Sequence, residues 1–250
     1  MPVLLRAVRV EVRLIVASCR VVASRMVAQR RSCHSSSMPR IPVPDALLRN
    51  FSRQLSGPTG SLGSLVARML NKGNAPVIAS AVQALDLAGS EEVADIGFGG
   101  GLGLDLLLEQ TGVGGRVHGV EPSPDMVKRA RKAHSPQLEA GRLALHEAGM
   151  ESLPIADSAL DGWISLNTVY FIQDLPTAFA ELRRVLRPSG KGVIGIADPE
   201  WMSQQPFTKY SFTVRPVSDV VTALTAAGLS VEQRSMPGSA PFRLLVCRPA

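Results

Sequence analysis

Residues 95–103 read Asp-Ile-Gly-Phe-Gly-Gly-Gly-Leu-Gly, and this stretch decides the expected fold. The apolar run over residues 92–98 is typical of a buried strand, and residues 103–110 have the pattern of a helix. Glycines in the turn between them let the backbone approach a ligand closely and adopt dihedral angles that other residues avoid. In an open α/β sheet such a turn lies at the carboxyl ends of the strands, where ligands bind. The stretch therefore predicts a ligand site in an α/β protein.

Short apolar runs continue to alternate with helical patterns along the rest of the chain. This alternation predicts a mostly parallel sheet with helices on both faces. Only Pro237-Gly238-Ser239 separates the last two strand-like runs, which is too short for a crossover helix, so these two should pair antiparallel. The expected strands are residues 92–98, 116–121, 142–147, 160–166, 191–197, 229–236 and 242–248, and the expected helices are residues 75–87, 103–110, 123–132, 175–186 and 217–227. We therefore predict a doubly wound α/β fold with a seven-stranded sheet whose last strand is antiparallel.

The composition is that of a globular chain. Of the 250 residues, 45% are hydrophobic and 19% are charged, which excludes an intrinsically disordered protein. Three cysteines cannot form a disulfide framework, and none has the C-x-x-C spacing of a metal or redox motif. The histidines have no partners at metal-ligand spacing, so no metal site is expected. The longest charge-free stretch near the N-terminus, residues 14–19, is far shorter than the roughly 20 apolar residues that span a membrane.

The net charge of +6 comes entirely from the N-terminal segment. Residues 1–37 hold seven arginines and one acidic residue, whereas residues 38–250 hold 20 basic and 20 acidic side chains. The larger part of the chain therefore has no net field that would attract a polyanion. We expect no nucleic-acid partner and no membrane span, and a small-molecule partner instead.

Residues 1–37 admit two interpretations. Arginines at positions 6, 9, 13 and 20 share one face of a helix, and a serine-rich stretch follows, which is typical of a mitochondrial transit peptide. Alternatively, translation starts at Met38 and the protein is cytoplasmic, which is the interpretation we favour. We expect three parts: an Arg/Ser-rich extension over residues 1–37, a helical leader over residues 38–74 and a ligand-binding domain over residues 75–250.

The second expected strand ends at an acidic residue, Glu121, which is placed to accept hydrogen bonds from both hydroxyls of a ribose. A nucleoside ligand is therefore expected, and the glycine spacing decides its type. The dinucleotide fingerprint G-x-G-x-x-G fails in both registers, because its third glycine falls on Leu102 or on Leu104. What remains is acid-x-Gly-x-Gly-x-Gly over residues 95–101, so a nicotinamide-dependent oxidoreductase is disfavoured.

These residues resemble the class I S-adenosylmethionine-dependent methyltransferases, in the small-molecule and ubiquinone-biosynthesis-like branch (methyltransferase type 11). The resemblance covers about residues 75–250 and includes residues 95–101, 120–123, 153–154, 160–161 and 184–190. It implies a Rossmann-like fold, S-adenosyl-L-methionine as cofactor, a glycine loop around its methionine portion and Glu121 on its ribose. The cofactor-binding residues that the resemblance implies are Asp95, Gly97, Phe98, Gly99, Gly101, Glu121, Pro122, Gly149, Met150 and Asn167.

One position departs from the family pattern. Relatives carry Asp-Ala four residues before a Leu-Pro pair, with the aspartate on the adenine amino group, whereas this chain carries Gly149-Met150. The methionine backbone can still bond to the adenine edge, and Glu147 or Glu151 is the candidate substitute for the missing carboxylate. Residues 54–60 and 69–74 are similar to a leader that packs over the cofactor in some members of the family.

Three aromatic residues are the candidates for the methyl-acceptor site. Tyr170 follows the fourth expected strand, and Trp201 and Tyr210 lie in residues 199–216, a segment that covers the acceptor in many relatives. Each has a structural alternative, because aromatic residues beside helices are also typical of a core. Relatives that methylate amino groups of adenine or glutamine carry Asn-Pro-Pro-Tyr (or Phe) here, whereas residues 167–170 read Asn-Thr-Val-Tyr, which favours a small organic acceptor.

Methyl transfer from a sulfonium is an in-line displacement that depends on alignment and exclusion of water more than on an acid or base. The sequence therefore identifies no catalytic residue. The predicted function is S-adenosylmethionine-dependent methyl transfer to a small organic acceptor. The first alternative is a non-catalytic protein that binds S-adenosylmethionine, because Gly149 replaces an acid, and the second is an NAD(P)-dependent oxidoreductase.

Overall fold

The structure is a computed structural model that describes residues 45–56, 60–236 and 241–250. The expected extension over residues 1–37, the beginning of the leader and the Pro237-Gly238-Ser239 link lie outside these ranges. The division into extension, leader and domain stays a prediction.

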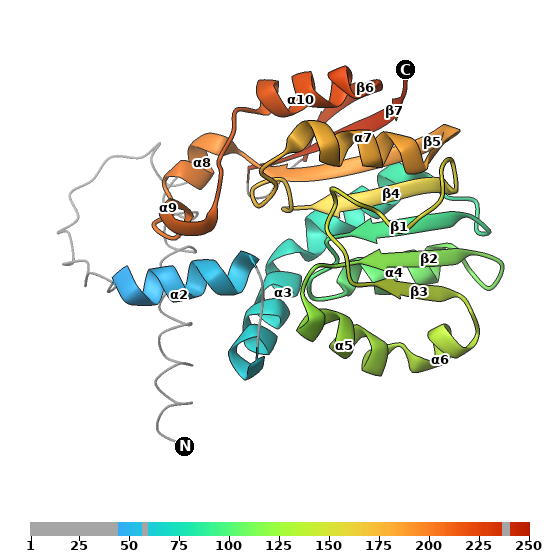
Figure 1. The fold of residues 1–250 in the computed structure, drawn as a ribbon, viewed down its shortest axis with the longest axis horizontal. Coiled ribbons are helices and arrows are strands. Elements are labelled where there is room, and N and C mark those ends of the chain that lie inside the picture. The colour runs from blue at the N-terminus through green and yellow to red at the C-terminus, as the bar shows by residue number, and fades with distance from the viewer. Residues whose placement is uncertain (1–44, 57–59, 237–240) are drawn as a thin grey trace, which may run out of the picture. The chain divides into compact units, whose positions relative to one another are not determined.

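The sheet has seven strands in the order β3-β2-β1-β4-β5-β7-β6 (Figure 1). Strand β7 pairs antiparallel with both of its neighbours, and the other pairings are parallel. The prediction of seven strands with the last one antiparallel is therefore confirmed. The strands are β1 (Glu92–Ile96), β2 (Arg116–Val120), β3 (Leu143–His146), β4 (Leu160–Leu166), β5 (Leu186–Ala197), β6 (Leu229–Ser235) and β7 (Phe242–Pro249).

The strand order reverses between β1 and β4. Strand β1 pairs with β2 on one side, where the chain continues, and with β4 on the other side, to which the chain returns later. Crossover connections leave these two strands in opposite directions, and a ligand crevice forms at such a switch point. The glycine stretch follows β1, so the fold itself places it at the crevice.

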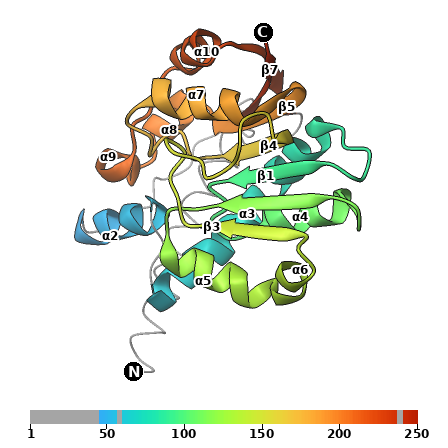
Figure 2. The ribbon, with the colours of Figure 1, turned by 45° about the vertical axis from the view of Figure 1, so that its right-hand side comes forward.

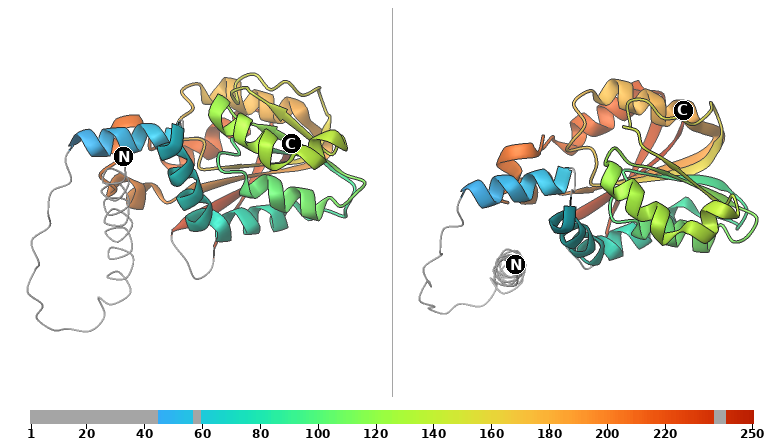
Figure 3. Two further views of the ribbon diagram at one scale, coloured as in Figure 1. Left: turned by 90° about the horizontal axis from the view of Figure 1, so that it is seen from below. Right: turned by 60° about the horizontal axis from the view of Figure 1, so that its bottom comes forward.

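Helices cover both faces of the sheet, as the doubly wound prediction requires. The helix α7 lies on one side of the sheet, and α3 and α4 lie on the other (Figure 3). Figure 2 shows α5 and α6 beside β3, and α10 at the opposite end of the sheet, beside β7. The helices are α2 (Asp45–Ser56), α3 (Gly60–Leu85), α4 (Leu102–Gln110), α5 (Pro124–Ala133), α6 (Ser135–Glu139), α7 (Leu175–Val185), α8 (Pro199–Ser203), α9 (Thr208–Ser211) and α10 (Val217–Ala226).

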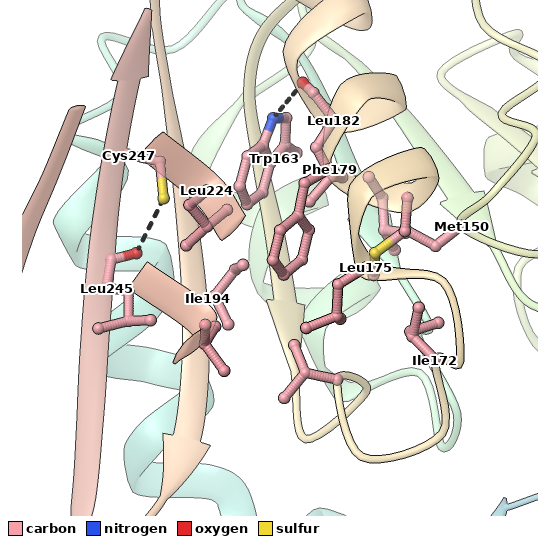
Figure 4. Packing of buried hydrophobic residues seen from close by; sticks show 14 of the residues in the cluster. Met150, Trp163, Ile172, Leu175, Phe179, Leu182, Ile194, Leu224, Leu245 and Cys247 are labelled. Atoms are coloured by element: carbon pink, nitrogen blue, oxygen red, sulfur yellow. Dashed lines mark hydrogen bonds between the residues drawn. The ribbon is translucent and has the colours of Figure 1, made fainter. Parts of the chain in front are cut away.

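The core between α7 and the sheet is built around Trp163 on β4 (Figure 4). Its side chain is fully buried, and its indole Nε1–H donates to the Leu182 carbonyl of α7 at 3.1 Å. A Cβ on Gly192 of the neighbouring strand would lie 2.1 Å from the indole ring, so this glycine makes room for the tryptophan. Cys247 on β7 belongs to the same core and is also completely buried.

Some element boundaries differ from those that the sequence predicts. The helix α3 begins at Gly60 rather than at residue 75, and it continues through Pro76. Strand β5 begins at Leu186 rather than at residue 191, because Leu186 pairs with Leu160 before the register shifts. The helix α8 was not predicted. It begins where the Asp198 side chain accepts the backbone N–H groups of the two residues that follow Pro199, a typical N-cap.

Candidate functional site

The glycine loop and Glu121 meet at the carboxyl ends of β1 and β2. These strands are parallel, with Ile96 beside Val120, so the residues that follow them leave the sheet side by side. The Gly97 N–H donates to the Val120 carbonyl at 2.7 Å, and the Gly99 N–H donates to Glu121 Oε2 at 3.0 Å. The structure thus brings together the two motifs that the sequence separates by about 20 residues.

The loop needs glycine at alternate positions. The φ angles of Gly97, Gly99 and Gly101 are 79°, 49° and 87°, in the left-handed region that other L-residues avoid. At Gly97 there is also no space, since a Cβ would lie 2.2 Å from Cγ2 of Thr168 in the turn after β4. The loop backbone therefore turns close to the neighbouring strand end, and its glycines place no side chains between the backbone and the crevice.

Glu121 is 6% exposed and has acceptor capacity to spare. Its Oε2 accepts the Gly99 N–H, and its Oε1 accepts the Ser123 N–H at 3.0 Å. Burial raises the pKa of Glu121, and these two hydrogen bonds act in the opposite direction. An ionised carboxylate has about four acceptor positions. Two are used by the chain, so the other two fit a vicinal diol such as that of a ribose.

Asp95, the last but one residue of β1, is 4% exposed. Its Oδ2 points into the first turn of α4, at 2.1 Å from where a Cβ on Gly103 would be. Burial and the negative charge of Glu121 raise the pKa of Asp95 to about 8. Across the part of the chain that the structure describes, no hydrogen bond to Asp95 is found. A buried carboxyl group without a donor fits a ligand that brings a cationic group or a hydrogen-bond donor.

The stability of the ligand-free chain is expected to fall as the pH rises from about 4 to about 8. In this window folded Asp95, with its pKa of about 8, holds a proton that the unfolded chain has released. Asp95→Asn removes this linkage, so its free energy of unfolding should fall less between pH 5 and pH 8. Urea unfolding at each pH tests this. Glu121 is present in both chains, so its titration affects both alike. If the free energy of unfolding falls equally in the wild type and the variant over that range, the prediction is wrong.

The segment after β3 packs against the end of β2. The Glu121 N–H donates to the His146 carbonyl at 3.1 Å, and the Ala148 N–H donates to the Glu121 carbonyl at 3.3 Å. Met150 is 4% exposed and belongs to the core (Figure 4). Glu151 is half-buried, and its Oε2 lies 3.0 Å from where a Cβ on Gly149 would be. Its carboxylate therefore lies beside the position at which relatives carry an acid, whereas Glu147 is exposed.

The remaining predicted cofactor residues differ in their surroundings. Asn167 adopts a left-handed conformation (φ 59°) at the end of β4 and is half-buried. Pro122 is exposed beside Glu121. Phe98 is 6% exposed and packs into the core on the α4 side of the sheet. Its side chain therefore anchors the loop to the core.

Asn71 of α3 contacts the glycine loop, and the sequence did not single out this residue. Its Nδ2–H donates to the carbonyl of Gly100 at 2.9 Å. A Cβ on Gly100 would lie 2.1 Å from the Asn71 side-chain oxygen, so the two residues fit closely. The only signal in the sequence was the likeness of residues 69–74 to a leader. That this leader packs over the cofactor stays a prediction.

The three acceptor candidates have different surroundings. Tyr170 is 4% exposed, and its hydroxyl accepts the Ala197 N–H at 2.7 Å and donates to the Ala197 carbonyl at 3.3 Å. Burial raises the pKa of Tyr170 above its ordinary value. Trp201 packs on the core from α8, and Tyr210 on α9 lies under the guanidinium group of Arg49, 5.3 Å from the ring centroid. Their role toward an acceptor stays a prediction.

Tyr170→Phe should lower the free energy of unfolding by about 1–3 kcal/mol, the cost of an unsatisfied buried polar group. The buried N–H of Ala197 would lose its acceptor, the Tyr170 hydroxyl. Affinity for S-adenosylhomocysteine should stay as in the wild type, since no hydrogen bond of this hydroxyl reaches the glycine loop. Urea unfolding and calorimetric titration measure the two quantities. A loss of affinity without a loss of stability would instead assign Tyr170 to the site.

Residues 94–194 match the family model described as "Methyltransferase domain". The chain is 34% identical over 122 residues to an uncharacterised 37.1 kDa protein in transposon TN4556 of Streptomyces fradiae, covering 49% of this chain and 34% of that protein. It is 33% identical over 112 residues to the ubiquinone/menaquinone biosynthesis C-methyltransferase UbiE of Paracoccus denitrificans, covering 44% of this chain and 45% of that protein. The chain thus spans less than half the length of these two relatives.

A solved structure confirms the fold. The mitomycin 7-O-methyltransferase MmcR is similar with a TM-score of 0.63 at 19% identity, covering 80% of this chain and 60% of that one. The chain thus shares the fold of that structure, and its residues 94–194 are similar to a methyltransferase domain.

Two further observations concern the residues that the structure describes. None of their helices has both the length and the apolar character of a membrane-spanning helix. No three or more histidine, cysteine, aspartate or glutamate side chains among them gather in a way that could hold a metal ion.

Proposed function

We propose that the chain transfers a methyl group from S-adenosyl-L-methionine to a small organic acceptor. The observation that carries this proposal is the pair of buried carboxyl groups, Asp95 and Glu121, at the glycine loop. One has two acceptor positions left, and the other has no donor in the described chain. A ligand with a diol and a cationic portion would satisfy both, and S-adenosyl-L-methionine has a ribose, an ammonium group and a sulfonium.

Different residues of the site would bind different parts of the cofactor. Glu121 would accept hydrogen bonds from the ribose hydroxyls. The backbone of Gly97, Gly99 and Gly101 would surround the methionine portion, next to Asp95. The backbone of Met150 would lie along the adenine edge, because its segment is hydrogen-bonded to the end of β2.

When bound, S-adenosyl-L-methionine supplies a methyl group activated by the sulfonium. The residues of the chain then have to orient the acceptor in line with the breaking bond and exclude water. The rigid setting of the loop serves this purpose, since Gly97 is fixed against Thr168 and Gly100 is fixed by Asn71. We assign no base, because an acceptor that is already nucleophilic needs none.

A small organic acceptor is supported by two kinds of evidence. UbiE is named for ubiquinone and menaquinone biosynthesis and MmcR for mitomycin, which are small molecules. In this chain, residues 38–250 balance 20 basic against 20 acidic side chains, which disfavours a polyanionic substrate. The alternative of a non-catalytic binding protein rests on Gly149, where relatives carry an acid.

Calorimetric titration of the full chain with S-adenosylhomocysteine, with NADH as the control, tests the cofactor. Binding of the first and not of the second supports the proposal, and the reverse result would assign the chain to the oxidoreductases. Incubation with methyl-labelled cofactor and a panel of phenols, amines and thiols then tests the transfer. Binding without transfer to any member of the panel would favour the non-catalytic alternative.

A further inference from the structure

Aromatic rings from distant parts of the chain gather outside the carboxyl ends of the strands. Four phenylalanines form a continuous series of ring contacts, which we call the ring cluster: Phe51, Phe171, Phe207 and Phe212. The centroids of Phe171 and Phe212 are 4.7 Å apart, and the next two contacts along the series are both 5.6 Å. The buried Tyr170 lies at its base, 5.8 Å from Phe212. The chain has only eleven aromatic residues, so this gathering is unusually dense.

The ring cluster begins beside the proposed cofactor loop. Thr168 packs directly on Gly97, because a Cβ on that glycine would lie 2.2 Å from the threonine methyl group. The Phe171 N–H donates to the Thr168 carbonyl at 2.9 Å, so Phe171 is held one turn away from that contact. In Figure 1 the arrowheads of β2 and β3 point to the side on which α2, α8 and α9 lie. The rings therefore extend outward from the edge of the sheet at which methyl transfer would take place.

Hydrogen bonds fix the three segments that carry these rings. The Thr213 N–H donates to the Tyr170 carbonyl at 2.8 Å, which joins the segment after α9 to the turn after β4. The Ser211 N–H donates to the hydroxyl of Ser52 at 3.1 Å, and Ser52 is fully buried on α2. The helices α2 and α9 lie side by side as a result (Figure 1). The rings are thus held in place by the backbone rather than by each other alone.

The four phenylalanines are all half-buried, so part of each ring remains accessible. Two arginines on the segments that carry the rings interact within the chain. Arg49 lies over the ring of Tyr210, which also bonds to Asp45, and Arg215 donates to the carbonyls of Val169 and Ile172. Lys209 on α9 is exposed. The accessible parts of these rings are planar and apolar, which suits a flat apolar group better than a charged one.

We infer that the ring cluster binds the methyl acceptor and that this acceptor carries a planar aromatic ring. The inference rests on the proposed function, because it takes the glycine loop as the cofactor site. Edge-to-face and offset contacts with Phe171 and Phe212 would orient the ring of the acceptor, and the position of Phe171 beside Thr168 would bring its nucleophilic atom toward the methyl group.

The test measures, by saturation-transfer NMR, the binding of 1-naphthol to the full chain saturated with S-adenosylhomocysteine. Cyclohexanol and sarcosine are the comparison probes. We expect 1-naphthol to bind more tightly than either, and Phe171→Leu and Phe212→Leu each to weaken it about two- to tenfold. Affinity for S-adenosylhomocysteine should stay unchanged in both variants. Phe179→Leu, a fully buried change on α7, is the control for a general loss of stability.

The outcomes separate this inference from the proposed function. If S-adenosylhomocysteine does not bind to the wild-type chain, the proposed function fails before the probes are used. If it binds but 1-naphthol has the same affinity in the wild type and both ring-cluster variants, the rings only pack α2 against the domain, and the inference is wrong. Equal binding of cyclohexanol and 1-naphthol would also overturn the choice of a planar acceptor.

Discussion

Glu121→Ala should weaken the binding of S-adenosylhomocysteine at least about 100-fold. Two hydrogen bonds from ribose hydroxyls to a carboxylate are worth about 1.5–3 kcal/mol each, and each 1.4 kcal/mol is a factor of about ten in affinity. The variant also frees the N–H groups of Gly99 and Ser123, which shape the loop around the ligand. Calorimetric titration measures the effect. The matched control is Glu109→Ala, an exposed glutamate at the end of α4.

A second substitution separates loss of the contact from loss of the fold. Glu121→Gln keeps the size of the side chain but replaces one oxygen by an amide that can only donate. The neutral amide oxygen accepts more weakly than a carboxylate, and the NH2 group cannot accept from a hydroxyl or a backbone N–H, so affinity should again fall, while the unfolding temperature stays close to that of the wild type. Wild-type affinity in both Glu121 variants would show that the ligand does not use this carboxylate.

Gly97→Ala should lower the free energy of unfolding by about 2–5 kcal/mol. The left-handed conformation costs a residue with a Cβ about 1–2 kcal/mol, and overpacking a filled site typically costs about 1–3 kcal/mol more. Both apply here, because the φ angle is 79° and the new methyl group would meet Cγ2 of Thr168. Affinity for S-adenosylhomocysteine should fall as well, because the loop turns at this residue. Urea unfolding and calorimetry measure the two effects.

The two causes can be separated with Thr168→Ser. This change removes the methyl group that Gly97→Ala would strike and keeps a hydroxyl beside Ser165. The double variant should recover the steric part of the loss and retain the part that comes from the backbone conformation. If Thr168→Ser recovers nothing, the conformation of the backbone alone explains why glycine is needed at this position.

Local sequence patterns were sufficient to predict most of the fold. The apolar runs identified the inner strands β1, β4 and β5, because a strand that is buried on both faces must be apolar nearly throughout, whereas β6 is mostly exposed. The short link before Phe242 required an antiparallel β7, since no crossover fits in it. The loop glycines and Glu121 could be predicted for the same reason: a turn after a strand and an acid at a strand end are features of neighbouring residues.

The contacts that the sequence did not reveal join residues that are far apart in the chain. Asn71 and Gly100 are 29 positions apart, and Ser52 and Ser211 are 159 positions apart. Nothing in the local pattern of either partner indicates the other. The same holds for the ring cluster, whose four phenylalanines come from three segments. Tyr170 was an acceptor candidate by its position after β4, but the tertiary structure engages its hydroxyl with Ala197.

The sequence by itself determined the class of fold, and it predicts the strand at which a ligand site is expected and the nucleoside character of that ligand, because periodicity, turn chemistry and glycine spacing are local properties. The tertiary structure alone decided that Asp95 and Glu121 share one buried environment, that Asn71 holds the glycine loop, and that phenylalanines from α2 and from residues 207–212 contact each other. These depend on how distant segments pack against each other, and only folding of the whole domain brings them together.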